Sequence, residues 1–276
     1  MSKSKNNWGL VMIDIYQVDS FTSERFKGNP AGVCILDEFP NGKSMLNLAR
    51  EMNLSETAFV VRNKDEFMLR WFTTTFEIDL CGHATLATAH ILWTEGFWHK
   101  DKPIIFNTRS GKLIVNLIDN LVEMNFPSLE CSEVSELPNT LIEALGGIKP
   151  IFLGKSGGNY LIEVATEEEV RGIQINISKL LECKMQGVIV TAKGTCQYDF
   201  VSRFFAPEVG VSEDPVTGSA HCVLATFWSE RLGITKFRAY QCSNRGGEVN
   251  LELLGDRVLL RGKAVTIFKG KLLEEL

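Results

Sequence analysis

The sequence predicts an α+β protein of two similar halves, each a curved sheet or open barrel wrapped around one apolar helix. The first observation is a repeat, in which Arg70-Trp71-Phe72 leads through a short polar loop into Gly82-His83-Ala84. Arg203-Phe204-Phe205 leads in the same way into Gly218-Ser219-Ala220. A strand and a helix start that are built twice indicate an internal duplication. The other two observations are the many short β-rich segments and the single long apolar helix in each half.

The first half contains six β-rich segments and two helical ones. Its expected strands are Met12–Val18, Thr57–Val61, Phe67–Phe72, Ile104–Asn107, Lys112–Leu117 and Leu121–Asn125. A helix is expected over Ser44–Met52, with Ser44 as its N-cap and its apolar residues on one face. The segment Ala84–Trp93 is almost entirely apolar, which predicts a helix that is buried on all sides.

The second half has a similar plan. Its expected strands are Tyr160–Val164, Gly187–Thr191, Phe200–Phe205, Phe237–Cys242, Val249–Leu254 and Arg257–Arg261. A long apolar helix is expected over Ala220–Leu232, and Gly233 supplies a good stop. The polar segment Pro127–Pro138 predicts the link between the halves.

The composition argues against several classes of protein. The 276 residues carry a net charge of −5 and no basic run, which argues against a nucleic-acid partner. Seven cysteines without a Cys-x-x-Cys pair fit reduced thiols better than a disulfide framework. We find no signal-peptide pattern and no apolar stretch long enough for a membrane. A cytoplasmic protein without nucleic-acid or membrane partners is therefore expected.

The two helix starts are candidates for binding a small anion. Gly82-His83 and Gly218-Ser219 each open an apolar helix, where free N–H groups and the helix dipole favour negative charge. His83 could donate a hydrogen bond to that anion or to an enolate-like oxygen; equally, it could cap its own helix. A zinc site of Cys81, His83 and His90 is disfavoured, because Cys-x-His is not a zinc-finger spacing.

Two carboxylates are candidates for proton transfer or substrate binding. Glu56 lies where a helix gives way to an apolar strand, and partial burial there would raise its pKa towards that of a general acid/base. From the pattern alone, a solvated loop glutamate is the favoured alternative. Asp214 precedes the second helix start, which Thr217 or Ser219 can cap; a plain capping loop is the alternative. Ser219 is disfavoured as a hydrolytic nucleophile because the Gly-x-Ser-x-Gly pattern is absent.

Six segments, in order along the chain, resemble one protein family. They are Asp19–Thr22, Gly28–Ala31, Asn53–Phe59, Arg70–Thr73, Leu80–Thr85 and Asp214–His221. Together they are similar to the PhzF family, the phenazine biosynthesis-like isomerases. The resemblance runs from about Ile15 to the C-terminal strand, and Arg203–Ala225 and Tyr240–Glu248 look most like vertebrate members.

The resemblance implies a diaminopimelate epimerase-like fold with the active site between the halves. It implies that a last strand, at about 264–276, returns to the first half. The halves expected are therefore 1–127 with this strand, and 128–263. The founding enzyme moves a proton between carbons of a dihydro-hydroxyanthranilate ring without metal or organic cofactor, so no cofactor is expected here. Members of the family are often dimers, so a homodimer is also an expectation.

The resemblance also implies roles for individual residues. Glu56, His83 and Asp214 match the family's catalytic residues, while Gly82, Gly218 and Ser219 match the site that holds the substrate carboxylate. The expected function is an isomerase that moves a proton in a small carboxylic acid.

Two alternatives to that function stay open. The same fold hosts racemases and epimerases with a thiol before each of the two glycines. Cys81 occupies the first such position, but Thr217 occupies the second, which disfavours this chemistry. The other alternative is a non-catalytic protein that binds or senses a small molecule.

Overall fold

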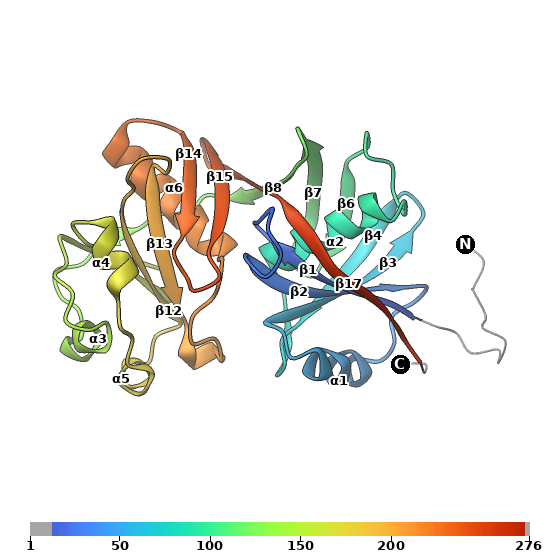
Figure 1. The fold of residues 1–276 in the computed structure, drawn as a ribbon, viewed down its shortest axis with the longest axis horizontal. Helices are drawn as coiled ribbons and strands as arrows, with labels where there is room; N and C mark the ends of the chain where they lie inside the picture. Colours follow the sequence, from blue (N-terminus) through green and yellow to red (C-terminus); the bar gives the residue numbers. More distant parts are fainter. Residues whose placement is uncertain (1–12, 274–276) are drawn as a thin grey trace. The chain divides into compact units, whose positions relative to one another are not determined.

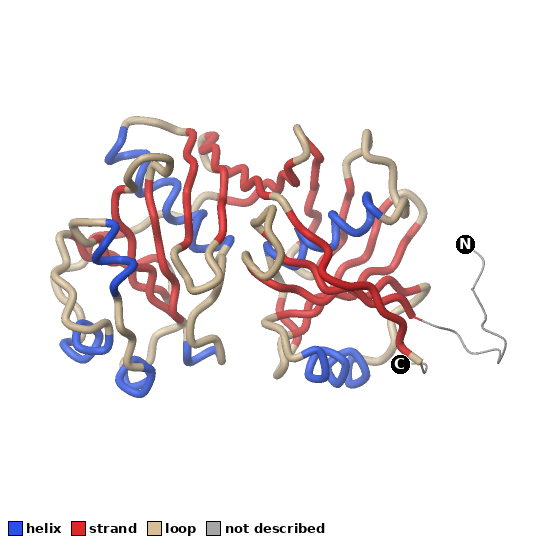
Figure 2. The backbone as a smooth tube through the Cα atoms, in the orientation of Figure 1, coloured by secondary structure: helices blue, strands red, loops and turns tan. Residues whose placement is uncertain are grey.

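The computed structural model describes residues 13–273. The chain forms two compact units, one comprising the chain up to Asn125 together with the segment from Gly262 onward, and the other comprising Phe126–Arg261. Each unit combines a strand-rich sheet with one long helix, α2 or α6, as Figures 1 and 2 show. Met12, where the first strand was expected to begin, lies outside the described residues.

Unit 1 contains one curved sheet. In spatial order its strands are β17 (Ala264–Leu272), β1 (Ile13–Ser20), β2 (Asn29–Leu36), β3 (Glu56–Asn63), β4 (Glu66–Phe72), β6 (Ile104–Thr108), β7 (Gly111–Ile118) and β8 (Leu121–Pro127). The short β5 (Glu77–Ile78) adds to β4.

Unit 2 contains a second sheet. In spatial order its strands are β9 (Ser132–Glu133), β10 (Phe152–Ser156), β11 (Asn159–Glu163), β12 (Gly187–Lys193), β13 (Phe200–Phe205), β14 (Lys236–Gln241), β15 (Gly247–Leu254) and β16 (Arg257–Gly262). Short helices join them: α3 (Asn139–Ala144), α4 (Glu167–Gly172), α5 (Ile177–Glu182) and the 3₁₀ turn η1 (Pro207–Val209).

The two sheets have the same pairing pattern. In both, successive neighbours run antiparallel, antiparallel, parallel, antiparallel, parallel, antiparallel and antiparallel. Strand β4 with its Arg-Trp-Phe run corresponds to β13 with its Arg-Phe-Phe run, and β17 takes in unit 1 the place that β9 takes in unit 2. The predicted duplication is confirmed at the level of topology.

The longest helix of each unit lies against the sheet of that unit. Helix α2 (Gly82–Thr94) contacts β1, β2, β3 and β17, and its residues are buried on nearly all sides, as predicted. Helix α6 (Gly218–Leu232) packs on β15 and ends at Gly233, whose φ of 67° fits the predicted glycine stop. Between residues 13 and 273 no helix is long and apolar enough to cross a membrane.

Helix α1 (Gly42–Met52) packs its apolar face against the outer side of the unit 1 sheet. The prediction that Ser44 caps it is wrong. The N-cap is Asn41, whose side-chain oxygen accepts from the backbone N–H of Ser44 at 2.9 Å. Asparagine stabilises a helix start well because its short side chain reaches that N–H. Asn53 ends the helix with a φ of 49°, and β3 begins three residues later.

Candidate active site

The candidate proton-transfer site of unit 1 lies where β3 and α2 begin. Glu56 is the first residue of β3 and His83 the second residue of α2. Glu56 Oε2 lies 3.2 Å from His83 Nε2, and the side chains are 14% and 7% exposed. Glu56 is thus partly buried, and the solvated loop glutamate that the pattern alone favoured is wrong. His83 does not cap α2, because the N-cap is Cys81.

Backbone and hydroxyl contacts hold this site together. Glu56 pairs with Ala31 across the parallel β2–β3 ladder. The Ser20 hydroxyl, at the end of β1, donates to the backbone oxygen of His83 at 2.7 Å. The N-cap residue Cys81 makes no side-chain capping hydrogen bond, so the N–H groups of the turn at Gly82 are candidate donors to a substrate carboxylate.

The imidazole of His83 has a neighbour at each ring nitrogen. Cys81 Sγ lies 3.6 Å from Nδ1, while Glu56 faces Nε2. Burial alone would lower the pKa of His83, but the Cys81 sulfur and the Glu56 carboxylate outweigh it and hold that pKa well above its usual value. Burial raises the pKa of Cys81, which favours the neutral thiol.

The pKa values of two other histidines are shifted in the opposite direction. His90 Nε2 lies 3.0 Å from the Thr266 hydroxyl, and His221 Nδ1 lies 2.8 Å from the Thr217 carbonyl oxygen. Burial lowers the pKa of each to about 4. Both are neutral at physiological pH, so among these three histidines only His83 is favoured as a proton carrier.

Among the described residues, His90 does not join Cys81 and His83 in a group of candidate metal ligands. His90 bonds to Thr266, and Glu56, Cys81 and His83 instead bring donor atoms within 4.8 Å of one another. The sulfur lies nearest Nδ1 and the carboxylate lies nearest Nε2. The donor atoms of the three residues are close enough together to be candidate ligands of one ion, as well as donors and acceptors of protons.

The second helix start, in unit 2, is organised by Asp214, Thr217 and Gln241. Thr217 is the N-cap of α6, but its hydroxyl donates to Asp214 Oδ2 at 2.5 Å instead of capping the helix. Gln241 of β14 accepts from the Thr217 N–H at 2.9 Å and donates to the Asp214 carbonyl at 2.6 Å. Gly218 is buried and Ser219 is exposed. The interpretation of Thr217 or Ser219 as a helix cap is thus wrong for Thr217.

Sequence reasoning missed several of these contacts. Gln241 lies 24 residues beyond Thr217, and no motif links it to the helix start. Cys81 stands two residues before His83, yet its contact with the ring depends on a side-chain orientation that no spacing reveals.

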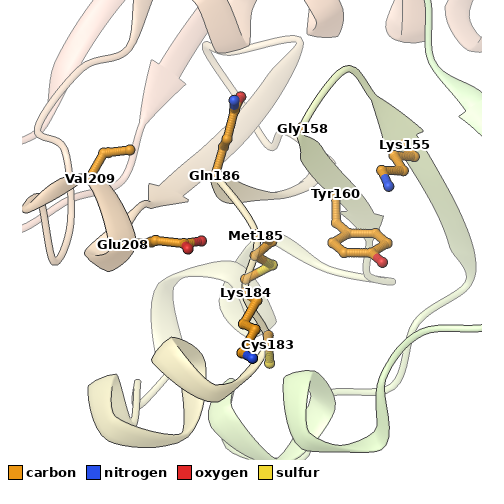
Figure 3. Close-up of a pocket in the computed structure, with 9 residues that line it drawn as sticks. All are labelled: Lys155, Gly158, Tyr160, Cys183, Lys184, Met185, Gln186, Glu208 and Val209. Atoms are coloured by element: carbon orange, nitrogen blue, oxygen red, sulfur yellow. The ribbon is translucent and has the colours of Figure 1, made fainter.

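A separate cavity of about 340 Å³ lies in unit 2. It is lined from β10, β11, the α5–β12 connection and η1, and Figure 3 shows its side chains. None of the predicted site residues lines it.

Comparison with known proteins identifies the family. The model of the PhzC-PhzF family, described as phenazine biosynthesis-like protein, matches residues 18–270. An uncharacterized isomerase of Halalkalibacterium halodurans is 48% identical over 96% of this chain and 100% of its own length. The human phenazine biosynthesis-like domain-containing protein is 37% identical over 94% of this chain and 99% of its own length. The chain belongs to the PhzF family of phenazine biosynthesis-like proteins.

Solved structures agree on the fold. A PhzF family protein of Enterococcus faecalis superposes with a TM-score of 0.90 at 40% identity, covering 95% of this chain and 99% of its own. A predicted epimerase of Pseudomonas aeruginosa gives 0.72 at 18% identity, over 95% of this chain and 99% of its own, which is a likeness of fold alone. The α+β, diaminopimelate epimerase-like class expected from the sequence is confirmed.

Proposed function

We propose that the protein is a cofactor-independent isomerase that moves a proton between carbons of a small carboxylic acid, with Glu56 as the general acid/base. The observation that carries this proposal is the Glu56–His83 pair, 3.2 Å apart and almost buried. Neither Glu56 Oε2 nor His83 Nε2 makes a well-aligned hydrogen bond within the described residues, so both atoms have capacity for a substrate.

The proposed reaction needs no electron donor or acceptor. Glu56 removes a proton from a carbon that its carboxylate faces, and the electrons of the broken C–H bond move into a double bond. The same carboxyl group then delivers the proton to another carbon. His83, held cationic by its neighbours, supports the ionised carboxylate before the proton moves. Positioned acid/base groups of this kind typically contribute ~10²–10⁴ in rate.

The other site residues are proposed to bind the substrate. The N–H groups at Gly82 suit a carboxylate for the reason given above. The family resemblance, rather than the geometry, assigns Asp214, Gly218 and Ser219 to the same substrate. The Thr217 hydroxyl on Asp214 favours the ionised carboxylate, which suits orientation of a substrate donor.

The test is hydrogen exchange into a substrate. Small carboxylic acids that raise the melting temperature are incubated with the enzyme in D₂O and followed by NMR. Replacing Glu56→Gln should lower the exchange rate at the substrate carbon by about 10²-fold or more, while the thermal shift by the acid persists. Glu51→Gln, at an exposed position of α1, is the matched control and should exchange normally. Full exchange by Glu56→Gln would overturn the assignment.

The alternative of an amino-acid racemase is weaker in this structure. Its second thiol is absent, and Thr217 in that position is engaged with Asp214. Optical rotation measured across a panel of amino acids separates the two activities. A screen in which no small acid raises the melting temperature would favour the non-catalytic alternative.

A further inference from the structure

We propose that Cys81 is a positioning residue that holds the His83 imidazole with Nε2 towards Glu56. Its sulfur accepts a hydrogen bond from Nδ1–H when the ring is charged. This inference rests on the proposed function of Glu56 and His83. It gives Cys81 a role different from that of a racemase base.

The geometry gives the ring a preferred orientation. A histidine ring can rotate about its second side-chain torsion with a two-fold preference. With the ring as it stands, Nδ1 meets the Cys81 sulfur at 3.6 Å and Nε2 meets Glu56 at 3.2 Å. A half-turn would place ring carbons at both positions and remove both contacts. Cys81 is 7% exposed, so water is largely excluded as a replacement partner.

Within residues 13–273, the other polar groups around the ring do not contact Nδ1, so Cys81 is the residue that can hold the ring orientation there. From β3, Glu56 faces Nε2. From β1, the Ser20 hydroxyl contacts the backbone oxygen of His83 rather than the ring, and the Asp19 carboxylate accepts from the Phe26 N–H at 2.8 Å. Cys81 and Glu56 are the titratable groups that act on His83.

The thiol can serve both charge states of the ring. When His83 is neutral with its proton on Nε2, the S–H of Cys81 donates to Nδ1. When His83 takes up a second proton from solvent, an Nδ1–H bond forms and donates a hydrogen bond to the sulfur, while the S–H bond of Cys81 stays intact. Burial keeps Cys81 a thiol, so it exchanges donor and acceptor roles without losing its own proton. A buried N–H⁺ without this partner would be unsatisfied, which disfavours the charged ring.

The experiment is an NMR titration of the His83 ring, which needs no substrate. In Cys81→Ala the midpoint should fall by about one to two pH units, because the charged ring loses its Nδ1 acceptor. Cys81→Ser keeps a hydroxyl on a shorter side chain and should show a smaller fall; it also serves if the alanine variant does not fold. Cys34→Ala, a buried thiol in the α1 cluster, is the matched control and should leave the midpoint unchanged.

A second readout links the orientation to activity. In Cys81→Ala, kcat for proton exchange should fall while KM changes little, because the substrate contacts are kept. An unchanged His83 midpoint in Cys81→Ala and Cys81→Ser would overturn the inference. Failure of the proposed function would look different: Glu56→Gln would exchange normally whatever the titration of His83 shows.

Discussion

The starts of α2 and α6 share a backbone plan but differ in chemistry. Cys81 and Thr217 occupy the same N-cap position, and neither caps its helix with a side chain. Cys81 contacts the ring of His83, whereas Thr217 bonds to Asp214 and is followed by an exposed Ser219. The duplicated frame therefore has two helix starts without an N-cap side-chain bond, while the side chains differ: one start has a thiol and an imidazole, the other has hydroxyl groups.

A second pair of equivalents has been kept. Arg70 in β4 makes two hydrogen bonds to Glu77, both 2.7 Å, and Arg203 in β13 makes two to Glu213, of 2.6 and 3.0 Å. Each pair ties a strand to the loop that leads to the helix start. The two halves are thus alike in these arginine–glutamate pairs and differ in the side chains at the two helix starts.

The largest expected effect on stability separates these two arginines. Arg203→Met should lower the free energy of unfolding by about 3–5 kcal/mol, because it leaves a nearly buried Glu213 unpaired. Arg70→Met should cost about 1 kcal/mol, since Arg70 is 25% exposed and Arg109 still pairs with Glu77 at 2.7 Å. Urea unfolding followed by circular dichroism measures both. Equal losses of unfolding free energy in the two variants would contradict this difference and show that the Arg70–Glu77 and Arg203–Glu213 pairs stabilise the protein equally.

The histidines of the two helices should give opposite pH dependences. The folded-state pKa of His221 is about 4, below its usual 6.5. As the pH falls from about 6.5 to 4, the unfolded chain binds a proton at this histidine before the folded chain does, so the stability that His221 contributes is lost. This should lower the free energy of unfolding by up to about 3 kcal/mol. The raised pKa of His83 acts the other way: its contribution is complete below about 6.5 and is lost as the pH rises through the higher folded value.

Unfolding by urea from pH 4 to pH 9 tests this difference. His221→Gln keeps a donor for the Thr217 carbonyl without titrating, so it should flatten the acid limb alone. His83→Gln should flatten the alkaline side. An unchanged acid limb in His221→Gln would contradict the assignment.

A smaller effect than those of Arg203 and His221 is expected for the hydroxyl at the second helix start. Thr217→Val removes the donor to Asp214 with little change of shape, and should lower the free energy of unfolding by about 1–2 kcal/mol. If Asp214 orients a substrate, KM should also rise. Thr217→Ser keeps the hydroxyl and serves as the control. A similar KM for Thr217→Val and Thr217→Ser would separate Asp214 from substrate binding.

Periodic and apolar signals predicted much of this fold. Helices α2 and α6 are predicted by their long apolar runs, and α6 also by the glycine that ends it. Strand β2 was not expected, because Gly28-Asn29-Pro30 at its start is typical of a turn. The six-residue helices α3, α4 and α5 were not expected either, since so few residues carry no clear period.

The site was predictable only in part. The place of Glu56 at the start of an apolar strand allowed partial burial, but the pattern alone favoured a solvated glutamate. The roles of His83 and Asp214 came from the family resemblance and stay predictions. The contacts of Cys81 with His83, and of Gln241 with Thr217, depend on packing between segments, which local sequence does not encode.

Strand β17 has a consequence for how the protein is made. It pairs with β1 along Ile13–Ser20, and its Thr266 holds His90 of α2. The ribosome nevertheless adds it only after every residue of unit 2. Unit 2 is contiguous in sequence, so it can complete its sheet during synthesis. Unit 1 lacks β17 until synthesis ends, and one side of α2 stays uncovered until then. The unit that begins the chain is therefore the one that finishes folding last.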